Sequence, residues 1–136
     1  MKRTRLHHVG YVTASIADSV QGYVLATGLQ WDGRIIREPL QMVNVAFLGD
    51  DGGGAAVELV ELAGRRSPVN RFLAAGGGLH HICLEVPDLA AHLATVQAGG
   101  CTLVRVPLPA AAFNGRKIAW ITTPSGDLIE LLQAAV

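Results

Sequence analysis

The chain carries one short pattern twice: Leu-His-His followed by a β-branched residue begins at Leu6 and again at Leu79. The matching segments "AAVELVEL" and "DLIELLQ" contain Glu58 and Glu130, and the interval from His8 to His81 is only one position longer than the interval between these glutamates. Two landmarks at nearly the same offset in a chain of 136 residues indicate an internal duplication. A unit of half this length has little core of its own, so the two copies must share one.

Each copy has the element order β-α-β-β-β according to its hydrophobic pattern. The expected strands are 7–13, 29–38, 42–50 and 55–62 in the first copy and 80–86, 101–108, 116–123 and 127–133 in the second. The expected helices are 16–26, a linker helix over 69–75, and 89–98, while "DDGGG" (50–54) and "TPSGD" (123–127) are typical of tight turns.

This order has too many strands per helix for a parallel sheet with repeated crossovers. We therefore predict an α+β fold in which two tandem βαβββ modules form a curved, mostly antiparallel sheet around a metal-binding cleft. The first module spans 1–66, the linker helix 67–78 and the second module 79–136, all within one structural domain.

Composition excludes several classes of function. Half of the residues are hydrophobic, and the 11 Lys and Arg residues balance the 11 Asp and Glu residues, so we expect a compact protein without a broad nucleic-acid surface. No apolar run is long enough to span a membrane, and no signal peptide is expected at the N-terminus. Cys83 and Cys101 lie outside any C-x-x-C pattern, so we expect reduced packing residues of a cytoplasmic protein.

The residues with the clearest chemistry are His8, Glu58, His81 and Glu130. Alternation along a strand places Glu58 on one face and Glu61 on the other, and Glu130 lies within an apolar strand, where an unligated carboxylate is costly to bury. One histidine and one glutamate from each copy can converge on one divalent cation. Imidazole and carboxylate ligands suit Co, Ni, Zn, Mn or Fe(II) without selecting among them.

Simpler interpretations exist for the same residues. A single histidine on a strand is more often a hydrogen-bonded core or rim residue than a metal ligand. Glu58 can face solvent on an edge strand, as we expect of Glu61. The duplication favours the metal site because the interval from the histidine to the glutamate is nearly equal in the two copies. His7 and His80 are expected to be structural or to orient the ligands.

At these residues the chain resembles the vicinal oxygen chelate (glyoxalase/bleomycin resistance) superfamily, and within it the methylmalonyl-CoA epimerase family. The similarity runs nearly end to end, and "SPVNRFLAAGGGLHHICLEVPDL" (67–89) is its most specific part. The resemblance implies that His8, His81 and Glu130 are metal ligands and that Glu58 is the fourth, at a position where the family accepts Gln or Glu. Small modules with open sheets commonly pair, so we expect a homodimer.

The chain departs from the family pattern in two places. Val45 occupies the position where many bacterial epimerases carry a second carboxylate, although some members also lack this acid. The closing hairpin has Asn114-Gly115 and Thr123-Pro124-Ser125 in place of the usual His-Gly pair and His-Pro-Lys turn. The hairpin changes lie near the region where an acyl-CoA is expected to bind, so they affect the expected substrate and leave the metal site intact.

The resemblance implies abstraction of an α-proton next to a metal-polarised carbonyl, with Glu130 as base and Glu58 as its partner. The expected substrate is methylmalonyl-CoA or a similar acyl-CoA thioester. Two alternatives are a glyoxalase I-type lactoylglutathione lyase or other metal-dependent lyase, which Glu58 favours, and a non-catalytic small-molecule binding protein. Five basic residues can hold a phosphate or carboxylate of the ligand: Arg65, Arg66, Arg71, Arg116 and Lys117.

Overall fold

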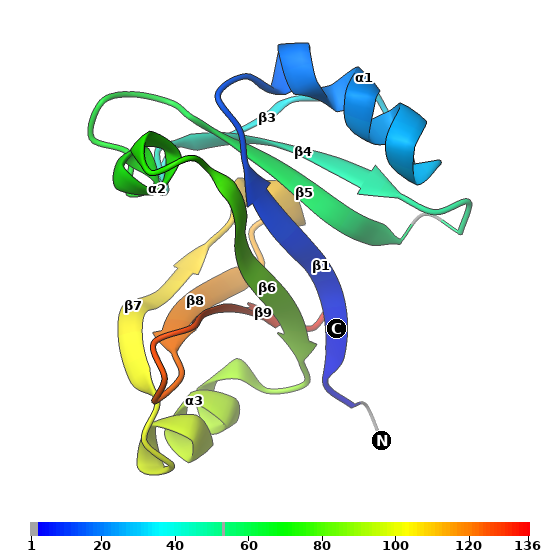
Figure 1. Cartoon of the computed structure of the whole chain (residues 1–136). Coiled ribbons are helices and arrows are strands. Elements are labelled where there is room, and N and C mark those ends of the chain that lie inside the picture. The colour runs from blue at the N-terminus through cyan, green and yellow to red at the C-terminus, as the bar shows by residue number, and fades with distance from the viewer. Residues whose placement is uncertain (1–2, 53) are drawn as a thin grey trace. The chain divides into compact units, whose positions relative to one another are not determined.

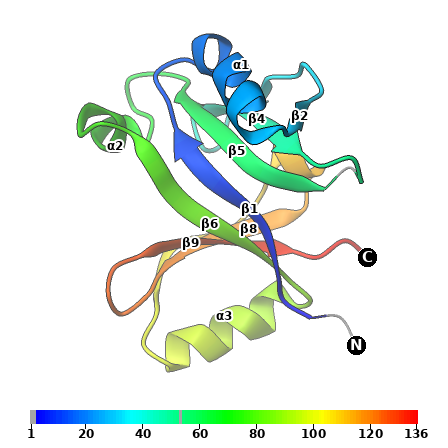
Figure 2. The ribbon, with the colours of Figure 1, turned by 45° about the vertical axis from the view of Figure 1, so that its right-hand side comes forward.

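The computed structural model describes residues 3–52 and 54–136 and confirms the α+β class. Figures 1 and 2 show the succession of strands and helices along the chain. The strands are β1 Arg5–Val12, β2 Gln30–Trp31, β3 Ile36–Glu38, β4 Val43–Gly49, β5 Ala55–Leu62, β6 Gly78–Val86, β7 Thr102–Pro109, β8 Lys117–Thr122 and β9 Leu128–Gln133. The helices are α1 Ile16–Thr27, α2 Asn70–Ala74, α3 Leu89–Ala98 and the 3-10 turn η1 Ala111–Phe113.

The chain forms two compact units. The N-terminal unit is His8–His80, and the C-terminal unit joins the start of the chain, up to His7, to His81–Val136. The chain therefore passes from one unit to the other within β1 and again within β6, each time between two adjacent histidines. The module limits expected from the sequence, 1–66 and 79–136, remain a prediction.

The N-terminal unit is a mixed sheet covered on one face by α1. Its strands lie in the order β2-β4-β5-β1, β3 also pairs with β4, and only the β1–β5 pair is parallel. Ile16 and Val20 of α1 pack on Ala46, Leu48 and Leu59 of the sheet. The residues that alternate with these, including Phe47 and Glu58, belong to the other face.

The C-terminal unit repeats this plan with the strand order β6-β9-β8-β7 and a parallel β6–β9 pair. Leu89 and Leu93 of α3 pack on a cluster of sheet residues, Val86, Ala119, Ile121 and Leu131. The opposite face carries Cys83, Trp120 and Glu130, which are direct neighbours in the strand register. Each unit thus has a helix-covered face and a second face that is available for a site.

The predicted strand over 29–38 is wrong, because it is interrupted. A turn separates β2 from β3: the Asp32 carboxylate accepts a hydrogen bond from the Arg34 backbone N–H at 2.9 Å and another from the Arg34 side chain. Gly33 adopts φ 85°, which a residue with a side chain rarely does. Asp-Gly is a turn sequence in its own right, and this local chemistry overrides the apolar pattern around it.

The other predicted elements agree with the structure to within a few residues. The predicted 50–54 turn is closed by the Asp50 N–H donating to the Gly54 carbonyl at 3.1 Å, with Gly53 outside the described residues. The 123–127 turn is closed by the Thr123 N–H donating to the Asp127 carbonyl at 2.9 Å. Neither cysteine forms a disulfide. Among the described residues, no helix is long and apolar enough to cross a membrane.

Glu61 does not face solvent, contrary to the sequence expectation. Its carboxylate accepts a hydrogen bond of 2.7 Å from the backbone N–H of Ile16, the first residue of α1, and one of 3.3 Å from the Asn44 amide. Gln133 occupies the equivalent place in the C-terminal unit, where its side-chain oxygen accepts from the Leu89 N–H at 2.8 Å. Each unit therefore ties the start of its helix to the last strand of its sheet.

Candidate metal centre

His8 and Glu58 form a buried pair in the N-terminal unit. The register pairs Gly10 with Glu58, so His8, two residues before Gly10 on β1, faces the same side of the sheet. The His8 Nε2 atom lies 3.5 Å from the Glu58 Oε1 atom, and the two residues are 0 and 6 % exposed. The Phe47 ring contacts the His8 ring edge-on, with centroids 5.4 Å apart.

His81 and Glu130 form the equivalent pair in the C-terminal unit. Cys83 pairs with Glu130 in the register, which places His81 on the Glu130 face. The His81 Nε2 atom lies 3.4 Å from the Glu130 Oε1 atom, and the residues are 5 and 2 % exposed. The Trp120 ring contacts the His81 ring edge-on at 4.7 Å, in the place that Phe47 takes in the other unit.

The chemistry of each pair fits a divalent metal ion. Two donor atoms that each lie about 2.1 Å from one ion are separated by about 3.0 Å at 90° and about 3.4 Å at a tetrahedral angle. The observed separations of 3.5 and 3.4 Å are of this size. In each unit, therefore, one imidazole nitrogen and one carboxylate oxygen are separated by a distance that is suitable for two ligands of one ion.

His7 and His80, which precede the ligand-type histidines, make edge-on contacts with aromatic rings. The His7 ring meets Phe113 of η1 at 5.2 Å within the C-terminal unit, and the His80 ring meets Phe72 of α2 at 4.8 Å within the N-terminal unit. The sequence did not single out Phe47, Phe72 or Phe113. The signal for Phe47 was its sequence offset from Trp120, which equals the offset between the two ligand-type histidines.

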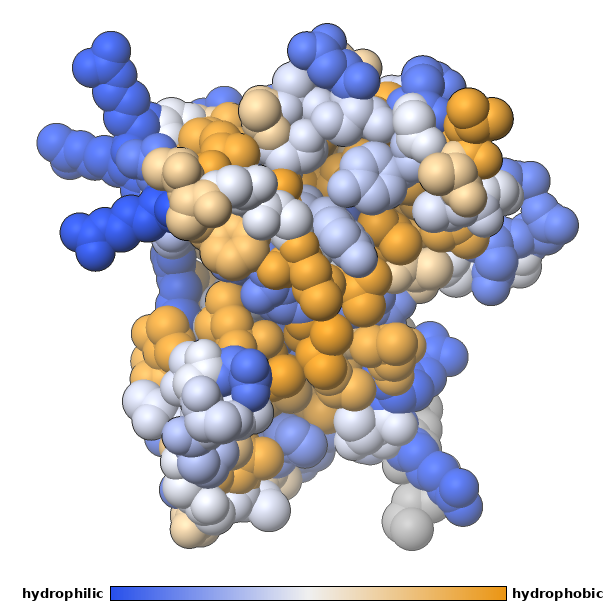
Figure 3. Space-filling view, in the orientation of Figure 1, coloured by the Kyte–Doolittle hydropathy of each residue, from blue (hydrophilic) through white to orange (hydrophobic). Residues whose placement is uncertain are grey.

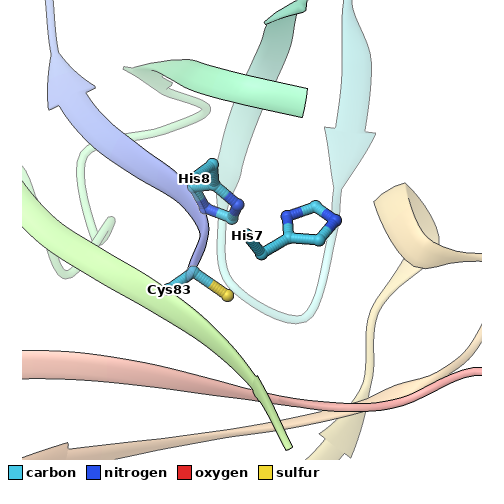
Figure 4. Close-up of side chains that lie close together, drawn as sticks. All are labelled: His7, His8 and Cys83. Carbon is cyan, nitrogen blue, oxygen red and sulfur yellow. The ribbon is translucent and has the colours of Figure 1, made fainter. Parts of the chain in front are cut away.

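Cys83 lies beside His7, and both belong to the C-terminal unit. Figure 4 shows the two side chains close together, with His8 next to His7 on β1. The Cys83 side chain is fully buried and lies directly across from Glu130 in the β6–β9 register. The prediction that Cys83 packs in the interior is therefore consistent with its burial, and the thiol borders the His81–Glu130 pair.

A second group of charged residues lies on the Glu130 face of the C-terminal unit. Glu85, two residues after Cys83 on β6, accepts a hydrogen bond of 3.0 Å from Arg5 and one of 2.9 Å from Arg116. Partial burial raises the pKa of the Glu85 carboxyl, but the hydrogen bonds from Arg116 and Arg5 outweigh it and hold this pKa below its usual value.

Of the five basic residues that the sequence singled out, Arg116 alone has described side-chain contacts to a carboxylate. Arg65, Arg66, Arg71 and Lys117 are exposed. Val45 is buried on β4, and it shares the Glu58 face because it pairs with Val60. Asn114 and Gly115 turn the chain between η1 and β8 with φ 55° and 84°.

The family model described as the glyoxalase/bleomycin resistance protein/dioxygenase superfamily matches residues 7–120. The chain belongs to this superfamily.

Several similar proteins within this superfamily have the same kind of name, that of an epimerase of methylmalonyl-CoA. The chain is 29% identical over 135 residues to the mitochondrial methylmalonyl-CoA epimerase of Dictyostelium discoideum, covering 93% of this chain and 76% of the relative. It is 28% identical to an ethylmalonyl-CoA/methylmalonyl-CoA epimerase of Cereibacter sphaeroides, covering 95% and 97%. A solved structure of the Streptomyces coelicolor methylmalonyl-CoA epimerase in complex with 2-nitronate-propionyl-CoA matches with a TM-score of 0.81, 26% identity, and coverage of 99% and 100%.

These similarities extend over nearly the whole chain of this superfamily member. They confirm the expected likeness to the methylmalonyl-CoA epimerases and support an enzyme with epimerase function. They also confirm the expected fold class, since the matched structures have the same mixed sheet with few helices.

Proposed function

We propose that the chain is a metal-dependent epimerase that inverts the α-carbon of methylmalonyl-CoA or a similar acyl-CoA thioester. The observation that carries the proposal is the pair of buried His–Glu couples at equivalent positions of two repeated units. The similarity to epimerases of malonyl-type CoA thioesters supports the substrate class.

The proposal includes one shared metal ion held by His8, Glu58, His81 and Glu130. Chain connectivity supports it, because β1 and β6 pass between the units at His7–His8 and His80–His81, directly before the two ligand-type histidines. A duplicated module with one His and one Glu in each copy would provide four ligands, and an ion that accepts six donors would keep two positions for substrate oxygens. The metal is one of Co, Ni, Zn, Mn or Fe.

In this mechanism the two carboxylates move the proton. A divalent ion bound here would polarise the carbonyl next to the α-carbon and stabilise the charge that develops there. Glu130 accepts the α-proton as general base, because a carboxylate that shares the ion can leave it and reach the α-carbon. Glu58, at the equivalent position of the other repeat, would start the turnover protonated and released from the ion. It gives this proton to the other face of the α-carbon, and exchange with solvent then restores both carboxyl groups. Val45 cannot contribute a proton, so this pair replaces the second acid of many bacterial epimerases.

Solvent exchange tests the proposal. The protein is loaded with Co(II), incubated with methylmalonyl-CoA in D2O, and the α-carbon is followed by mass spectrometry. We expect deuterium incorporation that Glu130→Gln abolishes. Glu61→Gln is the matched control, because Glu61 is a carboxylate on the opposite face of β5. Lack of exchange in protein shown to hold one metal ion would overturn the epimerase assignment.

A glyoxalase I-type reaction is the second candidate, and the observation that favours it is the buried glutamate, rather than glutamine, at position 58. Isomerisation of a hemithioacetal by the same Co(II) protein, without exchange of the CoA thioester, would support it. Binding of thioesters without either reaction would instead support a non-catalytic binding protein.

The proposal also includes a homodimer in the cytoplasm. Large apolar side chains are exposed on β1, β6 and β7, namely Leu6, Leu79, Val104 and Val106. Figure 3 shows apolar side chains at the surface over the strands of the C-terminal unit. Sedimentation equilibrium tests the assembly, and a monomer at micromolar concentration would contradict it.

A further inference from the structure

The two units differ at two neighbouring positions, which are apolar in the N-terminal unit and charged in the C-terminal unit. Val12 of the N-terminal unit corresponds to Glu85, and Val43 corresponds to Arg116, each at the same sequence offset that relates His8 to His81. Val12 and Val43 are buried. In the C-terminal unit an ion pair, with 2.9 Å between the Arg116 Nη1 and Glu85 Oε2 atoms, stands at the same places.

A partly buried ion pair commonly stabilises a fold no more than well-packed apolar side chains at the same place would. Desolvation of two charges offsets most of their attraction, and well-packed apolar side chains are commonly as good or better. In the N-terminal unit the equivalent positions are filled by buried valines, so this fold can be built with apolar side chains there. The charged pair therefore calls for a reason other than stability.

The geometry of Arg116 leaves donors for a ligand. Its hydrogen bonds to Glu85 and to the Gln133 carbonyl, at 2.9 and 3.1 Å, both come from Nη1 among the described residues. A guanidinium has five N–H donors, and those of Nη2 and Nε take part in neither bond. The Phe113 ring lies 5.8 Å from the centre of the guanidinium and restricts its position.

The local charge suits an anion on the same face as Glu130. Arg5 also binds Glu85, so two guanidinium groups face one carboxylate and the net charge of the group is positive. Cys83 is the β6 residue opposite Glu130, and Glu85 lies two residues farther along the strand, a shift of about 7 Å. An anion held here would thus lie near the base without reaching it.

We propose that Arg116, held in place by Glu85 and supported by Arg5, binds an oxyanion of the substrate. The oxyanion is either the carboxylate of the malonyl-type acyl group or a phosphate of CoA, and arginine binds both through paired N–H donors. Arg116 is a binding residue that determines specificity for anionic thioesters. This inference rests on the proposed function for its choice of ligand.

Calorimetric titration with three ligands tests the proposal. Methylmalonyl-CoA carries both kinds of oxyanion, propionyl-CoA carries phosphates only, and the N-acetylcysteamine thioester of methylmalonate carries the carboxylate only. We expect Arg116→Gln to weaken methylmalonyl-CoA binding about 10- to 100-fold. Weaker binding of propionyl-CoA would assign the phosphate, and weaker binding of the small thioester would assign the carboxylate.

The control variant is Lys117→Gln, because Lys117 is the adjacent cation and alternates to the other face of β8. Equal losses for both variants would reduce the effect to general electrostatic attraction and overturn the proposal, as would unchanged binding in Arg116→Gln. If that variant is poorly folded, the double variant Glu85→Val/Arg116→Val copies the N-terminal unit, and it must show the same loss.

The outcome separates this inference from the proposed function. Wild-type protein that binds the thioesters but exchanges no α-proton would refute the epimerase and leave the anion site in place. Exchange in wild type with an unchanged KM in Arg116→Gln would refute the anion site and leave the epimerase in place. A purely structural role of Arg116 would lower the melting temperature without changing KM.

Discussion

Replacing Glu61 by alanine tests the hydrogen bond that joins the start of α1 to β5. The Glu61 carboxylate accepts from the Ile16 N–H at 2.7 Å, at the position where a helix has backbone donors with no partner of its own. Alanine removes the acceptor, and it also removes a negative charge from the helix N-terminus. A hydrogen bond to a charged group contributes about 1.5–3 kcal/mol, so we expect a loss of about 2 kcal/mol in the free energy of unfolding.

Glu61→Gln separates the acceptor from the charge. Glutamine keeps a carbonyl oxygen at the same reach, as Gln133 does naturally at the Leu89 N–H with 2.8 Å. The remaining loss is then the interaction of charge with the helix dipole, about 0.3–1 kcal/mol. Asp18→Ala is the control, because Asp18 is an exposed carboxylate in the first turn of α1 that affects the dipole without bonding to Ile16.

Urea unfolding followed by circular dichroism measures these differences. For a chain of this length, about 2 kcal/mol corresponds to a melting temperature lower by roughly 6–10 °C. The order of loss should be Glu61→Ala first, then Glu61→Gln and Asp18→Ala together. A Glu61→Ala variant within about 0.5 kcal/mol of wild type (the scatter of surface substitutions) would refute the reasoning, and equal losses for alanine and glutamine would assign the effect to charge alone.

Three further outcomes follow from the structure. Cu(II) or Co(II) bound at His81 should quench mainly the fluorescence of Trp120, whose ring lies 4.7 Å from the imidazole, so the response should survive Trp31→Phe and disappear in Trp120→Phe. Because the folded-state pKa of Glu85 is lowered, its ion pair should stabilise the fold above about pH 4.5 and lose this contribution as pH falls further, so the stability difference between wild type and Arg116→Gln should shrink at pH 3. Added Co(II) should raise the melting temperature with concentration, and EDTA should reverse the rise; an unchanged melting temperature would count against a folded-state metal site.

The fold class could be predicted because two local features of the sequence specify it. These are the repeated Leu-His-His pattern, which indicates the duplication, and the alternation of apolar and polar residues, which indicates the strands. It also singled out His8, Glu58, His81 and Glu130 as candidates, and the structure places each His beside the Glu of its own unit. Their joint role as ligands of one ion stays a prediction.

Three features could not be predicted from the sequence. Glu61 looked solvent-exposed because a strand pattern gives the face of a residue but not which helix end covers that face. The Glu85–Arg116 pair escaped because its partners are far apart in the sequence and charged residues on strands usually meet water. The break between β2 and β3 was missed because an Asp-Gly turn was set among residues of high β-propensity.

The crossing of the chain between its two units bears on how such a protein can arise. The start of β1 contacts the second copy, through Arg5 with Glu85 and His7 with Phe113, while the first residues of β6, up to His80, belong with the first copy. In each repeat, therefore, the beginning of the first strand belongs to the compact unit formed mainly by the other repeat. A one-module ancestor with this architecture would have been an obligate pair that exchanged strand ends, and gene fusion would have made that exchange internal. Expressing the two halves as separate chains should consequently give fragments that fold only together.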